Sequence, residues 1–476
     1  MSARFDLHPR HARPRHNPEG KWRITRNVDG CLNCGKCADA CLYDVHRRRK
    51  DDYRIMAEPE DHRCRNCWMC VQVCPAQVLT MTENETYLAM GDDLYTPDIM
   101  ASIWRAAEKG EVPVSGCGYG GPFSGPGYDA MWTDMSEIVR PTRDGIHGRE
   151  YISTAVDLGY KPGDVCGIRF GGDGFPQGDI PPTIEIKIPI LFNRLTFYKG
   201  QPAINLAIAK AAAELGTFAI MESREITPEL SAYDASIIEH LELDAAPWGT
   251  WNHLMATAKK RVIVEVADRE DLPRLVQSLK GANPDLCVMV LLAASESVID
   301  RARELALGRI GDVIHIHADS YGARIRGDAS APPSLPEILP RVHDALVAEG
   351  IRDRVTIVGS GDIAEPARVP KAIILGADAV AMGTPLLIAL ECNLCGECFH
   401  GGDCPRELSH VSPEWGATRV VNMIASWHNQ ILEILGAMGL REVSRLRGER
   451  GRAMTKDQLD AEIFARVFGR SGAHDG

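Results

Sequence analysis

The clearest indication of the fold is residues 356–385, which read TIVGSGDIAEPARVPKAIILGADAVAMGTP. This stretch begins as a buried strand that ends at Gly359-Ser360-Gly361 and continues as a helix. A second short strand then ends at Met382-Gly383-Thr384, before another helix begins. Strands separated by helices of about a dozen residues form right-handed βαβ units whose strands pair in parallel. The stretch therefore predicts an α/β protein with a parallel sheet.

The same rhythm extends upstream to about residue 184. Short apolar runs alternate with amphipathic stretches, and these runs cover residues 183–192, 217–221, 261–267, 286–294, 312–318, 354–361 and 378–383. Near-continuous apolar strands fit a sheet that is covered on both faces. Seven or eight such units predict a (β/α)8 TIM barrel. An open dinucleotide-binding sheet is the weaker alternative, because no G-x-G-x-x-G motif follows an early strand.

The two glycine-containing turns of the opening stretch are candidates for a phosphate site. In a barrel they would follow strands 7 and 8, where backbone N–H groups and a helix N-terminus can surround a phosphate. A Cβ atom there would hold the phosphate away from these amides. We interpret the turns as the phosphate site of an FMN cofactor, and ordinary barrel turns are the alternative. The candidate residues are Gly359, Ser360, Gly361, Asp362, Met382, Gly383 and Thr384.

Composition and charge narrow the functional classes. The 476 residues are 45% hydrophobic and 25% charged, as in a globular protein with a large core. The net charge of −12 argues against a protein that coats nucleic acid. No run of about 18 apolar residues predicts a membrane span, and the N-terminus has no apolar signal region. We therefore expect a cytoplasmic protein that acts on small molecules or protein partners.

Eight of the cysteines lie close together in residues 31–74. They form the spacing C-x2-C-x2-C-x3-C twice, and proline follows the last of them. This spacing resembles that of bacterial ferredoxins with two [4Fe–4S] clusters, in which the fourth ligand of each cluster comes from the other repeat. Two zinc knuckles are the alternative, although zinc needs only four ligands. The resemblance implies one cluster on Cys31, Cys34, Cys37 and Cys74, and a second on Cys64, Cys67, Cys70 and Cys41.

A second group of cysteines follows the last predicted barrel strand. Cys392, Cys395, Cys398 and Cys404 are again followed by proline. Their spacing suits a third iron–sulfur cluster, either [3Fe–4S] or [4Fe–4S], with Cys395 deciding between three and four ligands. A structural zinc site is the alternative. We expect the isolated Cys117, Cys166 and Cys287 to be ordinary small apolar residues.

The order of these parts resembles a known family. A ferredoxin module, a flavin barrel and then GTPLLIALECNLCGECFHGGDCP, residues 383–405, look like the FMN-binding synthase part of glutamate synthase. The N-terminal ferredoxin module is similar to the short, archaeal-type form, and N-methylglutamate synthase is divided in the same way. The resemblance implies that electrons pass through the clusters to FMN, which reduces the imine formed from 2-oxoglutarate and ammonia. It also implies amino-acid biosynthesis as the role.

The resemblance further implies that this chain works with partners. A separate glutaminase-type subunit and a glycine-rich β-helix subunit would complete a hetero-oligomer. A ferredoxin or an NAD(P)H-oxidising flavoprotein would donate electrons. We expect no nucleic-acid partner.

The substrate pocket departs from the family pattern. The family lysine that helps to hold 2-oxoglutarate has no counterpart between Asp285 and Ala294. Strand alternation would turn His315 and His317 toward the barrel interior, with Asp319 at the active-site end. We take His317, Asp319, Glu222 and Arg324 as candidate catalytic residues. Arg324 suits a carboxylate. The alternatives are structural hydrogen bonding for the histidine, solvated loop charge for Arg324 and a salt bridge with Arg224 for Glu222.

These departures leave two other functions open. One alternative is an electron-transfer subunit whose flavin only relays charge to a partner enzyme, and the other is a subunit of an N-methylglutamate synthase. We divide the chain into a basic, solvated tail (1–26), a ferredoxin-like domain (27–90), a connecting segment (91–183), the FMN barrel (184–391), a third cluster loop (392–410) and a helical segment (411–476).

Overall fold

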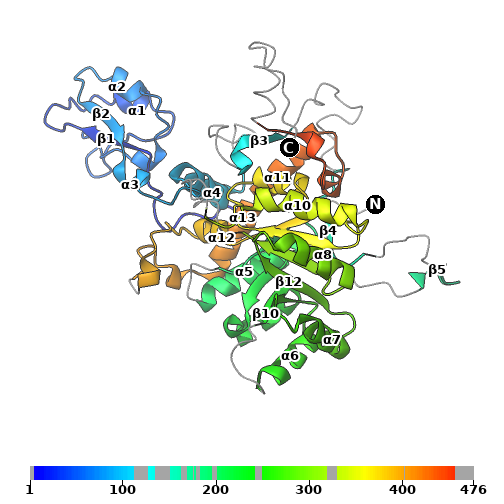
Figure 1. Cartoon of the computed structure of the whole chain (residues 1–476). Coiled ribbons are helices and arrows are strands. Elements are labelled where there is room, and N and C mark those ends of the chain that lie inside the picture. Colours follow the sequence, from blue (N-terminus) through cyan, green and yellow to red (C-terminus); the bar gives the residue numbers. More distant parts are fainter. Residues whose placement is uncertain are drawn as a thin grey trace, which may run out of the picture.

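The computed structural model describes most of the chain. Its described residues are 5–111, 127–133, 151–161, 169–174, 176–177, 183–195, 201–241, 249–318, 330–400 and 403–455. A small N-terminal domain lies beside a larger barrel, and the helix α4 (Pro97–Lys109) follows that domain along the chain (Figure 1). Among the described helices, none is both long and apolar enough to cross a membrane.

The N-terminal domain is built on two antiparallel strands. β1 (Trp22–Arg26) pairs with β2 (Leu79–Glu83), and the short helices α1 (Lys36–Asp39) and α2 (Met69–Gln72) follow the two cysteine loops. Ile24, Leu79 and Met81 belong to its small core. The 3-10 helix η1 (Asp61–Arg63) and the helix α3 (Glu85–Leu88) complete the domain. Residues 22–26 are therefore a strand of this domain, so the prediction of a tail up to residue 26 is wrong for this segment.

Eight parallel strands close into a barrel, as the sequence predicts. Every neighbouring pair is parallel, and the last strand pairs with the first. In order along the chain, the strands are β8 (Ile190–Phe192), β9 (Ala219–Glu222), β10 (Ile237–Leu241), β11 (Ile263–Ala267), β12 (Cys287–Ala293), β13 (Val313–His317), β14 (Thr356–Ser360) and β15 (Ala379–Met382). The α/β fold class is confirmed, and the two glycine-containing turns do follow strands 7 and 8.

Two strand predictions need correction. β10 was missed, because Glu239 and His240 interrupt its apolar pattern although both side chains are buried. The apolar run 183–192 is not one strand. Its first part, β7 (Thr183–Ile186), pairs with β4 (Val156–Gly159) outside the barrel, and only β8 belongs to the barrel. Pro189 lies just before β8, where its missing N–H ends regular pairing.

Helices cover the outside of the barrel. Several begin with proline in the first turn, where its fixed φ suits a helix and the missing N–H is harmless. Ser334 and Glu337 form a capping box before α10. The helices are α5 (Pro202–Leu215), α6 (Gly249–Lys260), α7 (Leu272–Ala282), α8 (Val298–Gly308), α10 (Leu335–Ala348), α11 (Arg368–Ile374) and α12 (Thr384–Ala389).

Smaller elements join these parts. The remaining strands are β3 (Met131–Thr133), which pairs with β16 (Ala453–Thr455), and β5 (Arg169–Phe170), which pairs with β6 (Pro176–Gln177). The remaining 3-10 helices are η2 (Gly127–Ala130), η6 (Ser223–Glu225), η7 (Pro228–Ser236), η8 (Glu397–His400), η9 (Leu408–His410), η10 (Val443–Leu446) and η11 (Arg450–Arg452).

The long helix α13 (Pro413–Ala437) joins the barrel to the N-terminal part of the chain. It packs on α5, α4 and α12. Residues 9–16, which we call the N-terminal strap, lie against it. The backbone N–H of Arg10 donates to Asn422 Oδ1 at 2.9 Å, and Asn422 Nδ2 donates back to the Arg10 carbonyl at 2.6 Å. Ala12 is buried. The strap is therefore packed against the fold, which corrects the prediction of a solvated tail.

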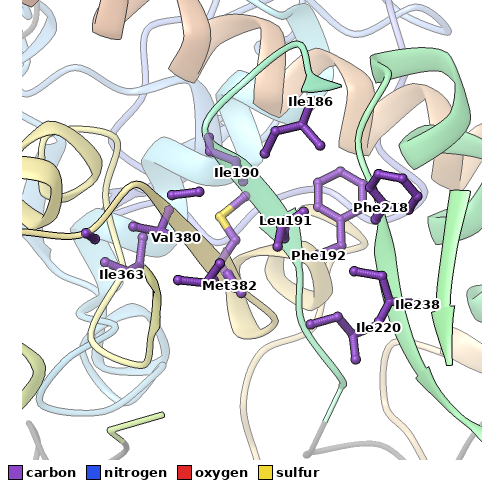
Figure 2. Close-up of a cluster of buried hydrophobic side chains, with 14 of the residues drawn as sticks. Ile186, Ile190, Leu191, Phe192, Phe218, Ile220, Ile238, Ile363, Val380 and Met382 are labelled. Carbon is purple, nitrogen blue, oxygen red and sulfur yellow. The ribbon is translucent and has the colours of Figure 1, made fainter. Parts of the chain in front are cut away.

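One continuous core fills the barrel and the space between its strands and the surrounding helices. Figure 2 shows part of it, with Phe192 from β8, Ile220 from β9, Ile238 from β10 and Met382 from β15 in one cluster. All four side chains are almost fully buried. Met382, a candidate cofactor residue, is therefore a core side chain, and only its backbone remains for a role in binding.

Candidate redox site

The first cysteine repeat surrounds one cavity of the N-terminal domain. Cys31, Cys34 and Cys37 line it together with Cys74 from the second repeat. The loop reaches round the cavity because Asn33 (φ 51°) and Gly35 (φ 84°) adopt left-handed conformations.

The second repeat surrounds a second cavity in the same manner. Its lining includes Cys64, Cys67, Cys70 and, from the first repeat, Cys41. Asn66 (φ 57°) and Trp68 (φ 60°) are left-handed at the positions that correspond to Asn33 and Gly35. The eight cysteines thus lie in the two exchanged sets that the ferredoxin pattern implies.

The four thiols of each set surround a space and do not converge on a point. Within the described residues, no three Cys, His, Asp or Glu side chains come close enough together to hold a single metal ion. A cavity lined by four thiols fits a cubane cluster, which binds one thiolate at each of its four iron atoms.

A third cavity is lined by α12 and by the loop that follows it. Cys392, Cys395, Cys398 and Cys404 all line it, so Cys395, on which the choice between three and four ligands depends, lies with the other three. Burial raises the pKa of the Cys392 thiol to about 12, and a backbone hydrogen bond from Leu394 opposes this only in part. A positively charged metal centre is what would keep such a buried thiol ionised.

The loop of this third cavity is anchored to the N-terminal strap. The Glu391 side chain is buried and accepts hydrogen bonds from the backbone N–H groups of Arg15 (2.9 Å) and His16 (3.2 Å). Arg419 on α13 lies 3.6 Å from the same carboxylate. Arg406 Nε donates to Asn393 at 2.9 Å within the loop. The sequence pattern did not indicate the contacts of Glu391 with the strap, because they join residues 375 and 376 positions apart.

The glycine-containing turns meet at the carboxyl ends of β14 and β15. A Cβ atom on Gly361 (φ 88°) would lie 1.4 Å from the carbonyl oxygen of Ala318, and one on Gly383 would lie 2.8 Å from that of Arg194. Close approach to neighbouring chain therefore already requires glycine at both positions, whereas the sequence argument rested on space for a phosphate. A Cβ atom on Gly359 would lie 3.1 Å from a side-chain carbon of Leu335.

Two other candidate phosphate residues have structural contacts. Asp362 is buried, and its Oδ2 accepts from the Leu335 N–H at 3.1 Å, where α10 begins. Its carbonyl accepts from Arg368 at 3.0 Å. The Thr384 hydroxyl forms a hydrogen bond with the buried Tyr95. The side chains of these residues hold the turns in place, so we expect a phosphate to meet mainly backbone N–H groups.

A buried polar network crosses the barrel interior. Glu265 on β11 is fully buried, and its two oxygens lie 2.7 Å from His240 Nδ1 and 2.5 Å from His315 Nδ1. His315 Nε2 lies 2.7 Å from the hydroxyl of Ser360, and His317 Nδ1 lies 2.8 Å from that same hydroxyl. Four strands, β10, β11, β13 and β14, therefore contribute to one chain of hydrogen bonds.

The chain of hydrogen bonds has a defined direction. Burial alone would raise the pKa of Glu265, but His315 and His240 outweigh it and lower that pKa, so Glu265 is ionised and only accepts. His315 must then donate from Nδ1, and in its neutral form it accepts from Ser360 at Nε2. Ser360 in turn accepts from His317 Nδ1. In its neutral form, His317 therefore has its proton on Nδ1.

Charged residues lie at the mouth of the barrel beside this network. Arg194, just after β8, lies 3.6 Å from Glu222 and 4.0 Å from Glu265. Glu222 also forms an ion pair with Arg224, as the alternative interpretation of the sequence expected. Glu225 accepts from the Glu222 N–H at 3.3 Å, and burial raises the pKa of Glu225.

The structure therefore brings His317 and Glu222 to the same end of the barrel. Asp319 and Arg324 lie outside the described residues, as do Cys117 and Cys166, whereas Cys287 is buried in β12 as expected. Sequence reasoning missed Glu265 and Arg194. The signal for Glu265 was a lone acidic residue within the apolar run 261–267.

Comparison with known proteins agrees with this arrangement. A 4Fe-4S dicluster domain matches residues 23–84, and a conserved region in glutamate synthase matches residues 261–441. The archaeal-type glutamate synthase (NADPH) of Dehalococcoides mccartyi is 28% identical over 90% of this chain and 94% of its own length. The archaeal glutamate synthase (NADPH) of Archaeoglobus fulgidus is 28% identical over 95% of this chain and 97% of its own. This chain is a homologue of the archaeal-type glutamate synthases.

This chain also matches longer and more distant proteins. The glutamate synthase (NADPH) large chain of Azospirillum brasilense is 30% identical over 38% of this chain and 12% of its own length. Among solved structures, a mandelate oxidase with an FMN adduct is 16% identical, covers 68% of this chain and 92% of its own, and has a TM-score of 0.41. The evidence for the barrel is the pairing of its eight strands.

Proposed function

We propose that this chain is the FMN- and iron–sulfur-dependent subunit of a glutamate synthase-type oxidoreductase. The observation that supports it most is the grouping of twelve cysteines into three cavities of four on a chain with a closed parallel barrel. Four such thiols suit a [4Fe–4S] cluster in each cavity. In the third, the position of Cys395 beside the other three supports [4Fe–4S] over [3Fe–4S].

The flavin would lie at the mouth of the barrel. The backbone of Gly359–Asp362 and of Gly383 and Thr384 would hold its phosphate, because these two turns adjoin at the carboxyl ends of β14 and β15. When bound, FMN supplies two-electron reduction of the substrate and one-electron exchange with the clusters. The Ser360 hydroxyl forms hydrogen bonds with His315 and His317, so only the backbone of Ser360 would contact the phosphate.

The substrate in this proposal is an imine formed from a 2-oxo acid and ammonia. Reduction of an imine requires a proton at nitrogen, and His317 is the group of this chain that we assign to hold it. Glu265 stabilises the charge that His317 gains, through Ser360 and His315. Arg194 has the charge and the exposure, 24%, to bind a substrate carboxylate. Glu222 holds Arg194 in position.

The archaeal-type relatives and the large chain of Azospirillum brasilense suggest an enzyme with more than one subunit. We propose a glutaminase-type subunit that supplies ammonia and a glycine-rich β-helix subunit, together with a ferredoxin or an NAD(P)H-oxidising flavoprotein as the electron donor. 2-Oxoglutarate is the proposed acceptor. Methylamine in place of ammonia would make the chain part of an N-methylglutamate synthase.

Anaerobic purification followed by substrate titration tests the proposal. We expect about twelve iron atoms and one FMN per chain, from the ligand sets above. Reduced enzyme should then be reoxidised by 2-oxoglutarate only when ammonia or methylamine is present, and stopped-flow absorbance of the flavin would follow this. Reoxidation that is indifferent to both substrates would overturn the synthase function and leave the chain as an electron relay.

A further inference from the structure

A buried arginine lies between the two cluster cavities of the N-terminal domain. Arg26 ends β1 and is 7% exposed. Its Nη1 donates to the Ala57 carbonyl at 2.6 Å, which fixes the guanidinium plane. Its Nη2 donates both to Cys37 Sγ at 3.8 Å and to His46 Nδ1 at 3.1 Å. Arg26 lines the first cavity and His46 lines the second, so this pair connects the two.

The protonation state of His46 follows from its partner. Arginine only donates hydrogen bonds, so His46 Nδ1 accepts and the proton of the neutral ring is on Nε2. His46 is 2% exposed, and within the described part of the chain Nε2 has no hydrogen-bond partner. A buried N–H without an acceptor is unfavourable. A sulfur atom of a cluster in the second cavity would supply the acceptor.

Both groups would act on the clusters in the same sense. Adding an electron to an iron–sulfur cluster makes it more negative, and N–H donors and nearby positive charge stabilise the added electron. Arg26 offers a charge and a donor to the first cluster. His46 offers a donor to the second, and its ring is oriented by Arg26.

We propose that Arg26 and His46 set the reduction potentials of the two ferredoxin-type clusters. Arg26 raises the potential of the cluster held by Cys37 through its hydrogen bond and its charge. His46 raises that of the second cluster through its Nε2–H. The proposal concerns the clusters alone, so it holds or fails independently of the substrate of the barrel.

An EPR-monitored redox titration of the full chain, with all clusters loaded anaerobically, tests the proposal. We expect Arg26→Gln to weaken reduction of the first cluster about tenfold, which is ~59 mV for one electron. His46→Leu should weaken reduction of the second cluster several-fold and leave the first nearly unchanged. The altered ligand of a Cys34→Ser variant identifies the signals of the first cluster.

Matched controls separate this effect from a general effect of charge. Arg23→Gln removes the same charge from the same strand at an exposed position and should leave both potentials unchanged. Arg26→Lys keeps the positive charge but lacks the paired N–H donors of a guanidinium. In this variant, the reduction potential of the first cluster should lie between those of wild type and Arg26→Gln. Arg26→Lys also keeps the test valid if Arg26→Gln does not assemble its clusters. If the potentials in the Arg26 and His46 variants match those of Arg23→Gln, the proposal is wrong.

Discussion

Glu265 shows how one side chain organises the interior of the barrel. Its carboxylate is fully buried and is balanced by His240, His315 and the nearby Arg194. A buried charge in this position is stable only while these partners remain, because removing one partner of a buried pair typically destabilises a protein by about 3–5 kcal/mol. Apolar side chains in these positions would often be as stable as the buried charges. The network therefore suggests a role in the reaction.

We therefore predict that Glu265→Gln destabilises the protein by about 3–5 kcal/mol and shifts the pH profile of activity. The amide keeps one acceptor oxygen but turns a donor toward one of the two Nδ1–H groups. Chemical denaturation and pH–rate profiles measure the two effects. Glu239→Gln is the control, because Glu239 is also buried but pairs with His253 and Arg261. It should lower stability without moving the pH profile; equal shifts in both variants would contradict the assigned role.

Lys371 gives a second prediction at the level of one residue. Its ammonium is buried, and it donates to the Tyr128 carbonyl at 2.8 Å. Burial first, and Arg368 second, lower the pKa of Lys371 to about 8. In the unfolded chain lysine keeps its proton to about pH 10.4. Between these values the unfolded state binds more protons, so stability should rise with pH over this window.

The measurement compares wild type with Lys371→Met. Wild-type unfolding free energy should gain about 2 kcal/mol between pH 8 and pH 10 relative to the variant. Urea denaturation at each pH provides these values. Parallel curves for the two proteins would show that the lysine is not desolvated as described.

At the level of elements, the periodicity of the sequence predicted the barrel well where strands were apolar. The runs that became β9 and β11 to β15 were found, because both faces of these strands are buried and their side chains are mostly apolar. β10 was not found, because Glu239 and His240 have partners that only the folded barrel supplies. The grouping of the cysteines was predictable from spacing, whereas Glu265 and Arg194 depend on contacts between distant strands.

The turn after β14 allows a direct test of close packing. Gly361→Ala would place a methyl group 1.4 Å from the Ala318 carbonyl oxygen at a φ of 88°. Gly350 has a similar φ of 67°, but nothing lies within 4 Å of the corresponding position. We predict that Gly350→Ala costs about 1 kcal/mol for its left-handed backbone and that Gly361→Ala costs several times more. Thermal unfolding of the two variants measures the difference, and equal losses would refute the close approach.

At the level of the whole molecule, the N-terminal strap, the loop of the third cavity and α13 depend on one another. Glu391 holds two backbone N–H groups of the strap and faces Arg419, which is fully buried. Contacts of this kind are invisible to sequence periodicity, so the strap was expected to be solvated. The loop that lines the third cavity is therefore joined to the strap through the residue that precedes Cys392.

We predict that Glu391→Ala destabilises the protein by about 3–5 kcal/mol and empties the third cavity. The substitution leaves Arg419 buried without its counter-charge and releases the loop that precedes Cys392. Iron analysis should show a loss of about four atoms per chain, while the two N-terminal clusters remain. Glu214→Gln removes an exposed ion pair with Arg10 of the same strap and should change stability by less than about 1 kcal/mol. Full iron content in Glu391→Ala would contradict this dependence.

The pairing of Arg10 with Asn422 across 412 residues also orders events during synthesis on the ribosome. The linings of both cavities of the small domain lie within residues 24–81, so they are complete before the barrel is translated. The third cavity has to wait until α13 emerges and the strap can settle on it. Metal insertion would then proceed in two stages, with the two N-terminal clusters first and the third cluster only after α13 has folded.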